Sequence, residues 1–140
     1  MDSRAGNVLA LDVGGRRIGV ALAHTVPRLP SPLTTILHED DIAAAIKRLV
    51  HEYQEIALVV GLPRGLNGQE TAQTKVVREF GARIEPIIGV PLYWQDEAVT
   101  SAKAEAELTS RGKPYTKADI DALSATYILE DFLRDNEGKI

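Results

Sequence analysis

Hydrophobic positions near the start of the chain fall in short, dense runs that are typical of strands. Segments 7–13, 17–23 and 33–37 are rich in apolar and partly β-branched residues, so we predict a strand in each. The Gly14-Gly15 pair separates the first two segments, and a loop with three prolines separates the next two. Because these breaks are short or lack a helix, consecutive strands are expected to run antiparallel.

The rest of the chain alternates helical periodicity with short apolar runs. Helices are predicted over 40–54, 69–85, 98–110 and 118–134, and strands over 56–60 and 90–95. Asp40 or Asp41 could cap the first helix, and Pro86 is expected to end the second. Strands joined through helices run parallel, so we expect one α/β domain with a mixed sheet over 1–134 and a frayed tail over 135–140.

The composition is that of an ordinary globular protein. The chain has 140 residues, of which 44% are hydrophobic and 26% charged, and it contains no cysteine. Disulfides and Cys-ligated zinc are therefore excluded. The chain lacks an apolar run long enough to span a membrane, and its polar start does not resemble a secretory signal, so we expect no membrane partner and a cytoplasmic location. A net charge of −4 means that nucleic-acid binding would need local Lys and Arg clusters or metal ions.

Three acids occupy positions where a carboxylate needs an explanation. Asp12 ends the first apolar run, Glu97 lies just past the last predicted strand, and Asp121 shares the apolar side of the final helix with Ala125 and Ile128. Burying a carboxylate is costly without a compensating cation, metal or set of donors. Ligands of open α/β sheets bind beyond the carboxyl ends of strands, which is where Asp12 and Glu97 are expected.

Each acid also has a structural explanation. Asp12 could simply start the Gly14-Gly15 turn, and Asp96-Glu97 could be a solvated acidic pair. Asp119, at the start of the last helix, is well explained as its N-cap. If the three acids do converge, their mutual repulsion calls for divalent cations, and oxygen-only ligands suit Mg²⁺ or Mn²⁺. Two such ions about 4 Å apart can orient water and stabilise a leaving oxygen in phosphodiester cleavage.

Four motifs together resemble the YqgF/RuvX-type family, whose fold is ribonuclease H-like. They are Ala10-Leu-Asp-Val-Gly-Gly-Arg-Arg-Ile-Gly-Val-Ala21, Val59-Val-Gly-Leu-Pro63, Asp96-Glu97 with Thr100, and Ile120-Asp-Ala-Leu-Ser-Ala-Thr-Tyr-Ile-Leu129. The resemblance covers almost the whole chain, in the family's order and spacing. It implies a five-stranded sheet, antiparallel in its first three strands and then parallel, with helices on both faces. It also implies a two-ion nuclease site at Asp12, Glu97 and Asp121.

The family is described both as a Holliday-junction resolvase and as a nuclease that matures the 5′ end of the pre-16S rRNA. We expect hydrolysis of structured nucleic acid in 5′-end processing of pre-16S rRNA, with resolution of four-way DNA junctions by a homodimer as the alternative. One position departs from the pattern, because Ala98 stands where the family usually has an arginine after its Asp-Glu pair. A cation that binds phosphate or orients the acid is therefore missing at that position.

Several polar residues are candidate substrate contacts. They are Arg16, Arg17, Arg64, Asn67 and Thr100. The arginines could hold phosphates through paired donors, and Arg64 and Asn67 belong to a glycine-rich loop, 61–68, whose N–H groups could approach a phosphate. The same residues could equally be solvated turn and loop side chains.

Two other function classes fit parts of the pattern. Asp-x-Gly-Gly after a first strand also resembles the phosphate loop of sugar kinases and actin-like ATPases, but 140 residues leave no room for their second domain. A binding module that contacts ribosomal or transcription components is the other alternative, and Ala98 and the acidic net charge favour it slightly.

Overall fold

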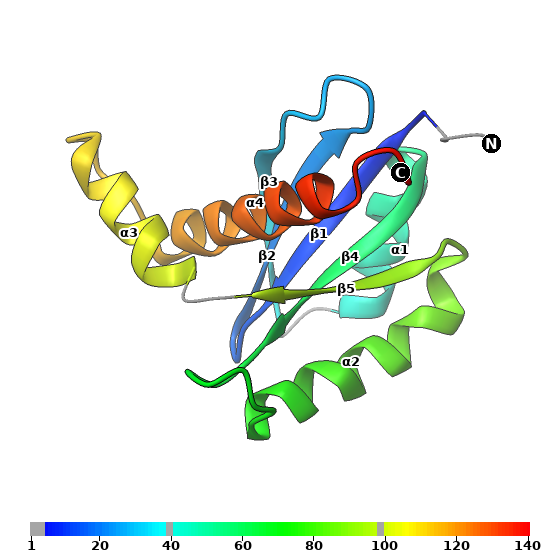
Figure 1. Ribbon diagram of the computed structural model, residues 1–140, viewed down its shortest axis with the longest axis horizontal. Helices are drawn as coiled ribbons and strands as arrows, with labels where there is room; N and C mark the ends of the chain where they lie inside the picture. Colours follow the sequence, from blue (N-terminus) through cyan, green and yellow to red (C-terminus); the bar gives the residue numbers. More distant parts are fainter. Residues whose placement is uncertain (1–4, 39–40, 98–99) are drawn as a thin grey trace.

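A five-stranded sheet forms the centre of the molecule (Figure 1). The computed structural model describes residues 5–38, 41–97 and 100–140. In chain order the elements are β1 (Asn7–Val13), β2 (Arg17–His24), β3 (Ser31–Leu37), α1 (Ile42–Glu52), β4 (Glu55–Pro63), α2 (Ala72–Ile88), β5 (Leu92–Glu97), α3 (Thr100–Ser110) and α4 (Lys117–Asp135). The strands lie side by side in the order β3-β2-β1-β4-β5.

The direction of the strands brings three strand ends to one end of the sheet. β2 runs antiparallel to both β1 and β3. β4 runs parallel to both β1 and β5. This confirms the predicted mixed sheet. The carboxyl ends of β1, β4 and β5 therefore lie at the same end, and Pro63 at the end of β4 is in register with Glu97 at the end of β5.

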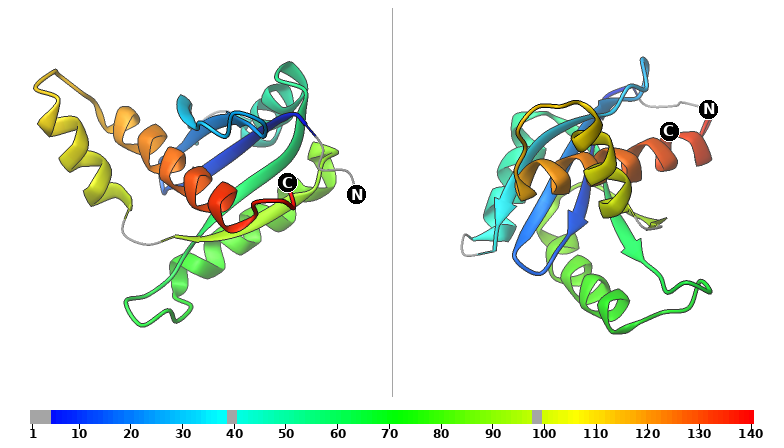
Figure 2. Two further views of the ribbon diagram at one scale, coloured as in Figure 1. Left: turned by 45° about the horizontal axis from the view of Figure 1, so that its top comes forward. Right: turned by 90° about the vertical axis from the view of Figure 1, so that its left-hand side faces the viewer.

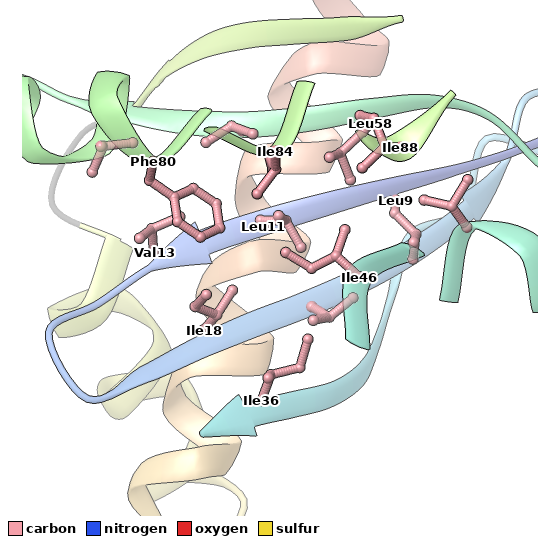
Figure 3. Packing of buried hydrophobic residues seen from close by; sticks show 14 of the residues in the cluster. Leu9, Leu11, Val13, Ile18, Ile36, Ile46, Leu58, Phe80, Ile84 and Ile88 are labelled. Atoms are coloured by element: carbon pink, nitrogen blue, oxygen red, sulfur yellow. The ribbon is translucent and has the colours of Figure 1, made fainter. Parts of the chain in front are cut away.

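Helices cover both faces of the sheet, as predicted. Figure 2 shows α1 and α2 on one face and α4 on the other. On the first face, Ile46 of α1 and Phe80 and Ile84 of α2 pack with Leu9 and Leu11 of β1 in one buried cluster (Figure 3). Burying apolar side chains of this size contributes about 1.5–3 kcal/mol each, so this cluster fixes the sheet that carries the strand ends.

On the opposite face, α4 lies close to the sheet because the strands present small residues to it. Ala10, Ala21 and Ala57 belong to the same buried cluster as Ile128 and Phe132 of α4. A third cluster joins α3 to the outer side of α4 through residues Ala104, Leu108, Leu123 and Tyr127. As a result, α4 is buried at every position from 122 to 129.

The predicted ends of β4 and α2 were wrong. β4 extends to Pro63, so Gly61 is a buried strand residue and not part of a phosphate-binding loop. α2 continues through Pro86 to Ile88 and ends at Gly89, which has a left-handed φ of 74°. The helix continues because Ile88 is buried in the core and a glycine cap follows, and these contacts outweigh the one backbone hydrogen bond that Pro86 cannot make.

The capping residues also differ in part from the prediction. Asp41 caps α1 by accepting a hydrogen bond from the Ala44 N–H. Thr116, and not Asp119, caps α4. Asp119 lies three positions later and accepts the Thr116 N–H at 2.8 Å, which completes a capping box.

The last residues, for which fraying was expected, make contacts with the body of the protein. The Arg28 guanidinium donates to the Ile140 carbonyl at 2.6 Å and also to the Leu133 carbonyl. Ile140 packs at the edge of the α4 cluster. Over the described ranges, none of the helices is both long and apolar enough to cross a membrane.

Candidate active site

Asp12 lies near the carboxyl end of β1, at the centre of the sheet. It is in register with Gly19 of β2, and the next residue, Val13, is opposite Ile18. Its side chain is half-buried among strands that are themselves in the core. Asp12 is therefore the last acid on a rigid strand before the turn, as the sequence predicted.

Gly19 allows Asp121 to approach the sheet. A Cβ at Gly19 would lie 1.9 Å from the Asp121 carbonyl oxygen and 2.9 Å from the Ala122 nitrogen. No side chain fits there, so α4 crosses β2 in direct backbone contact at this point. This crossing brings Asp121, from the far end of the sequence, beside the strand that pairs with Asp12.

Glu97 is the last residue of β5. The sequence had suggested that it lies just past the strand. Its side chain extends over β4, where a Cβ at Gly61 would lie 2.7 Å from the Glu97 Oε2. The same Oε2 is buried and has no hydrogen-bond partner. A buried carboxylate oxygen without a donor is costly, so this atom marks a place where a cation or a proton is needed.

The three acids interact electrostatically. Burial raises the pKa of Asp12 to about 6, and the charge of Asp121 adds to this shift. Burial also raises the pKa of Glu97 to about 8, with a further contribution from the charge of Asp12. The two shifts link Glu97 to Asp12 and Asp12 to Asp121, so a change of charge at any of them affects its neighbour.

Arg17 forms an ion pair with Asp121. Its Nε lies 2.5 Å from the Asp121 Oδ2, and both side chains are mostly shielded from solvent. Arg17 was predicted to contact phosphate, which stays a prediction; in the structure it pairs with a carboxylate of the candidate site. The alternation of a strand places Arg17 and Gly19 on one face of β2, and this is the only part of the arrangement that the sequence signals.

The acids fit a divalent cation in chemistry but do not converge on one point. Their donors are all oxygens, and the unpaired Glu97 Oε2 lies in the space that Gly61 leaves open. Within the described part of the chain, no group of three or more His, Asp or Glu side chains is arranged to hold a metal ion. Asp121 contributes to this lack of convergence, because its carboxylate is turned toward Arg17.

The other candidate contacts surround this end of the sheet without forming one cluster. Arg64 follows β4 and pairs with Asp96 at 3.1 Å and with Glu70 at 3.5 Å. Asn67 is exposed in the same loop. Arg16 is exposed in the turn after Asp12 and lines a hollow of about 410 Å³ with Gly15, Arg17, Leu37 and His38.

Two predictions fall where the structure gives no side-chain information. Ala98 lies outside the described residues. Thr100 is the first residue of α3, and its side chain is also outside the described part. Their contribution to the site stays a prediction.

His38 is a residue for which no role was predicted. Its Nε2 lies 2.7 Å from the Gly14 carbonyl oxygen, and its backbone N–H donates to the Arg16 carbonyl at 3.0 Å. His38 therefore fastens the turn that carries Arg16 and Arg17 to the end of β3. Only the pairing of β2 with β3 reveals this contact, because 24 residues separate His38 from Gly14.

The architecture places the chain in the class of RuvC-like ribonuclease H folds. The Thermus thermophilus RuvC structure superposes with a TM-score of 0.56 over 95% of this chain and 97% of that one, at 15% identity. The fowlpox virus resolvase, solved with Holliday junction DNA, has a TM-score of 0.54 at 7% identity, over 92% of this chain and 97% of that one.

Within that class, the chain belongs to the RuvX family. The family model, described as "RuvX: Holliday junction resolvase", matches residues 6–135. A relative from Roseiflexus sp. (strain RS-1), named "Putative pre-16S rRNA nuclease", is 44% identical over 95% of this chain and 97% of its own length. A relative of the same name from Thiobacillus denitrificans is 41% identical over 91% of this chain and 90% of its own length. The family expected from the four motifs is thereby confirmed.

Proposed function

We propose that the chain is a divalent-metal-dependent nuclease that hydrolyses phosphodiester bonds in structured RNA, with the pre-16S rRNA 5′ end as its substrate. The observation that carries this proposal is the placement of Asp12 and Glu97 at the carboxyl ends of β1 and β5, where the buried Oε2 of Glu97 has no donor. The names of the two relatives support the choice of substrate.

In this proposal, Asp12 and Glu97 are the principal metal-holding residues. Their carboxylates are fixed by rigid strands, and the buried Oε2 of Glu97 has no donor of its own. Asp121 is the third ligand, and it must give up its contact with Arg17 to act as one. Mg²⁺ or Mn²⁺, when bound, would activate a water molecule and stabilise the leaving oxygen.

Arg17 then has two roles. In the absence of metal it offsets the charge of Asp121, which would otherwise oppose ionisation of Asp12 more strongly. Once released from Asp121, its guanidinium is available to bind a phosphate of the substrate at the same end of the sheet. Arg16 and Arg64 are further phosphate contacts, with Arg64 oriented by Asp96 beside Glu97.

A second candidate, resolution of Holliday junctions, is favoured by the description of the family model. It requires two active sites across a symmetric junction, and hence a homodimer. A measurement of mass in solution discriminates the two, since a monomer at assay concentration contradicts junction resolution and is compatible with RNA processing.

The experiment that tests the proposal compares cleavage of a pre-16S rRNA fragment with cleavage of a four-way DNA junction. Wild type and Asp121→Asn are assayed with Mg²⁺ and with Mn²⁺. Asp131→Asn, on the same helix, is the matched control, because Asp131 pairs only with the exposed Arg134 in the described structure. We expect RNA cleavage by wild type and by Asp131→Asn, and its loss in Asp121→Asn. Preferential junction cleavage would support the second candidate, and tight binding without cleavage would identify a binding module.

A further inference from the structure

A cavity of about 250 Å³ lies at the turn between α3 and α4. Its apolar walls include Pro32 of β3, Tyr115 of the turn and Leu123 of α4, and its polar lining includes Arg111, Lys113 and Asp119. Pockets for drug-sized ligands reach roughly 300–1,000 Å³, so this smaller cavity suits one flat ring system. The acids of the candidate active site do not line it.

The cavity is preformed by hydrogen bonds within the turn. The Tyr115 hydroxyl lies 2.9 Å from the Thr109 Oγ1, which ties the ring to the end of α3. The Gly112 N–H donates to the Thr109 carbonyl at 3.2 Å, and Gly112 has the left-handed φ of 69° that this turn requires. The capping box with Thr116 fixes the Asp119 side chain. A ligand therefore meets walls whose conformation is already set.

The charges at the cavity suit an anionic ligand that also carries a hydrogen-bond donor. Lys113 is exposed and has no ion pair within the described residues, whereas Arg111 is partly neutralised by Glu107. Of the two carboxylate oxygens of Asp119, Oδ2 accepts the Thr116 N–H. No hydrogen bond to Oδ1 is found among the described residues, so this oxygen can accept one from a ligand. The combination of a cation, an acceptor and a tyrosine ring beside proline is that of a nucleotide site.

The position of the cavity connects it to the candidate active site. Asp119 and Leu123 lie on either side of Asp121 within about one turn of α4. In Figure 1, α3 and the beginning of α4 lie at the end of the molecule toward which β1 and β5 run. A strand whose phosphate reaches Asp12 and Asp121 can therefore place a nearby nucleotide at this turn.

We propose that this cavity binds one unpaired nucleotide. The base packs on Tyr115 and Pro32 and donates an amino hydrogen to Asp119, and Lys113 holds the phosphate. This inference rests on the proposed function only in taking the nucleotide from the substrate strand. A free mononucleotide has the same chemistry, and an aromatic side chain of a protein partner is the competing occupant.

The test is binding to the full chain without divalent cations, so that no cleavage is involved. Amide NMR spectra are recorded during titration with each of the four ribonucleoside monophosphates, a short single-stranded RNA, and the same sequence as a duplex. We expect single-stranded RNA to shift the amides of Lys113, Tyr115 and Asp119, and the duplex to leave them unchanged. Shifts with the RNA identify a strand as the source, and shifts with mononucleotides alone identify a free nucleotide. No shift at these amides with any of these ligands overturns the proposal.

Matched lysine variants separate the cavity from general charge attraction. Lys113→Ala and Lys117→Ala remove the same charge from the same region, but Lys117 does not line the cavity. We expect Lys113→Ala to weaken RNA binding about fivefold to tenfold and Lys117→Ala less than twofold. An equal loss in both variants would show that general charge attraction causes the effect, and it would contradict a nucleotide site. The readout here is RNA binding. If the chain proves inactive as a nuclease, the proposed function is overturned, but the binding result can still be interpreted.

Discussion

Two glutamates have buried carboxylate oxygens without a hydrogen-bond partner, but only one of them interacts with other acids. Glu97 lacks a partner for one carboxylate oxygen and interacts with Asp12, so it belongs to a group of acids. Glu55, at the start of β4, lacks partners for both oxygens, and burial alone raises its pKa to about 8. A lone buried acid lowers the free energy of unfolding without contributing to a site. Glu55 therefore tests the effect of burial on a carboxyl group independently of catalysis.

The Glu55 pKa predicts how stability depends on pH. The folded pKa, about 8, is above the ordinary value of 4.5, so the folded state holds the proton more tightly than the unfolded state. The stability that Glu55 contributes is present below about 4.5 and is lost as the pH rises to 8, by up to a few kcal/mol. Glu55→Gln should remove most of this loss. In urea unfolding, the variant should gain on wild type between pH 5 and pH 9.

The exposed Glu85 on α2 provides the control, since Glu85→Gln should change the free energy of unfolding equally at both values of pH. If Glu55→Gln shows no greater gain at pH 9 than at pH 5, the carboxyl of Glu55 is not held in its protonated form.

Arg17 is predicted to compete with metal for Asp121. Arg17→Gln should lower the free energy of unfolding without metal by about 1–2 kcal/mol, because a shielded ion pair is lost. It should also raise the thermal shift produced by Mn²⁺, because Asp121 becomes free to bind and the site gains negative charge. Arg16→Gln, at the exposed neighbour, should change neither quantity. Equal Mn²⁺ shifts in wild type and Arg17→Gln would show that Asp121 is not a ligand.

At the scale of elements, the site depends on glycines that bring helix and strands into contact. Gly19 admits the backbone of α4, and Gly61 leaves space for the Glu97 side chain. Both lie inside strands and have ordinary φ values, so their role is close approach and not turn formation. A side chain at Gly19 would meet the backbone of α4 and push it from the sheet, whereas one at Gly61 would displace the side-chain ends of Glu97 and Ile128.

Gly19→Ala is predicted to displace α4. The added Cβ would lie 1.9 Å from a backbone oxygen, which cannot move aside without moving the helix. We expect a loss of about 3 kcal/mol or more in the free energy of unfolding, at or beyond the upper end of ordinary overpacking, together with loss of cleavage. Gly15→Ala is the control, since nothing lies within 4 Å of its Cβ, and it should fold normally. A stable Gly19→Ala would contradict the close contact.

Local patterns predicted most of the elements, because strand and helix periodicity follow from which face is buried. The predicted end of α2 was wrong, since Pro86 opposes a helix locally and only the burial of Ile88 shows why the helix continues. The three acids of the site could be selected from the sequence as costly carboxylates. The partner of Arg17 and the contact between His38 and Gly14 could not, because they depend on how distant elements cross, although strand alternation places Arg17 on the same face of β2 as Gly19.

In the whole molecule, the two faces of the sheet have different structural roles. The face covered by α1 and α2 is a cluster of large aliphatic residues that fixes the sheet. The face covered by α4 is built on small residues, and it brings Asp121 to β2 and, through α3, forms the turn with the nucleotide-sized cavity. The beginning of α4 thus connects the candidate active site to the proposed nucleotide site, so we expect the substrate strand to pass along the first turns of α4, before the helix becomes buried at 122.

In the proposed function, Asp12, Glu97 and Asp121 form a metal-dependent site that cleaves phosphodiester bonds, and substitution of Asp12 tests this most directly. The measurement is the single-turnover cleavage rate of a pre-16S rRNA fragment by wild type and Asp12→Asn, with Mg²⁺ and with EDTA. Loss of a metal ligand removes several kcal/mol of transition-state stabilisation, so the variant should be at least about a hundredfold slower, and EDTA should abolish cleavage by wild type. Equal rates for wild type and Asp12→Asn, or cleavage that persists in EDTA, would contradict a metal-dependent site at Asp12.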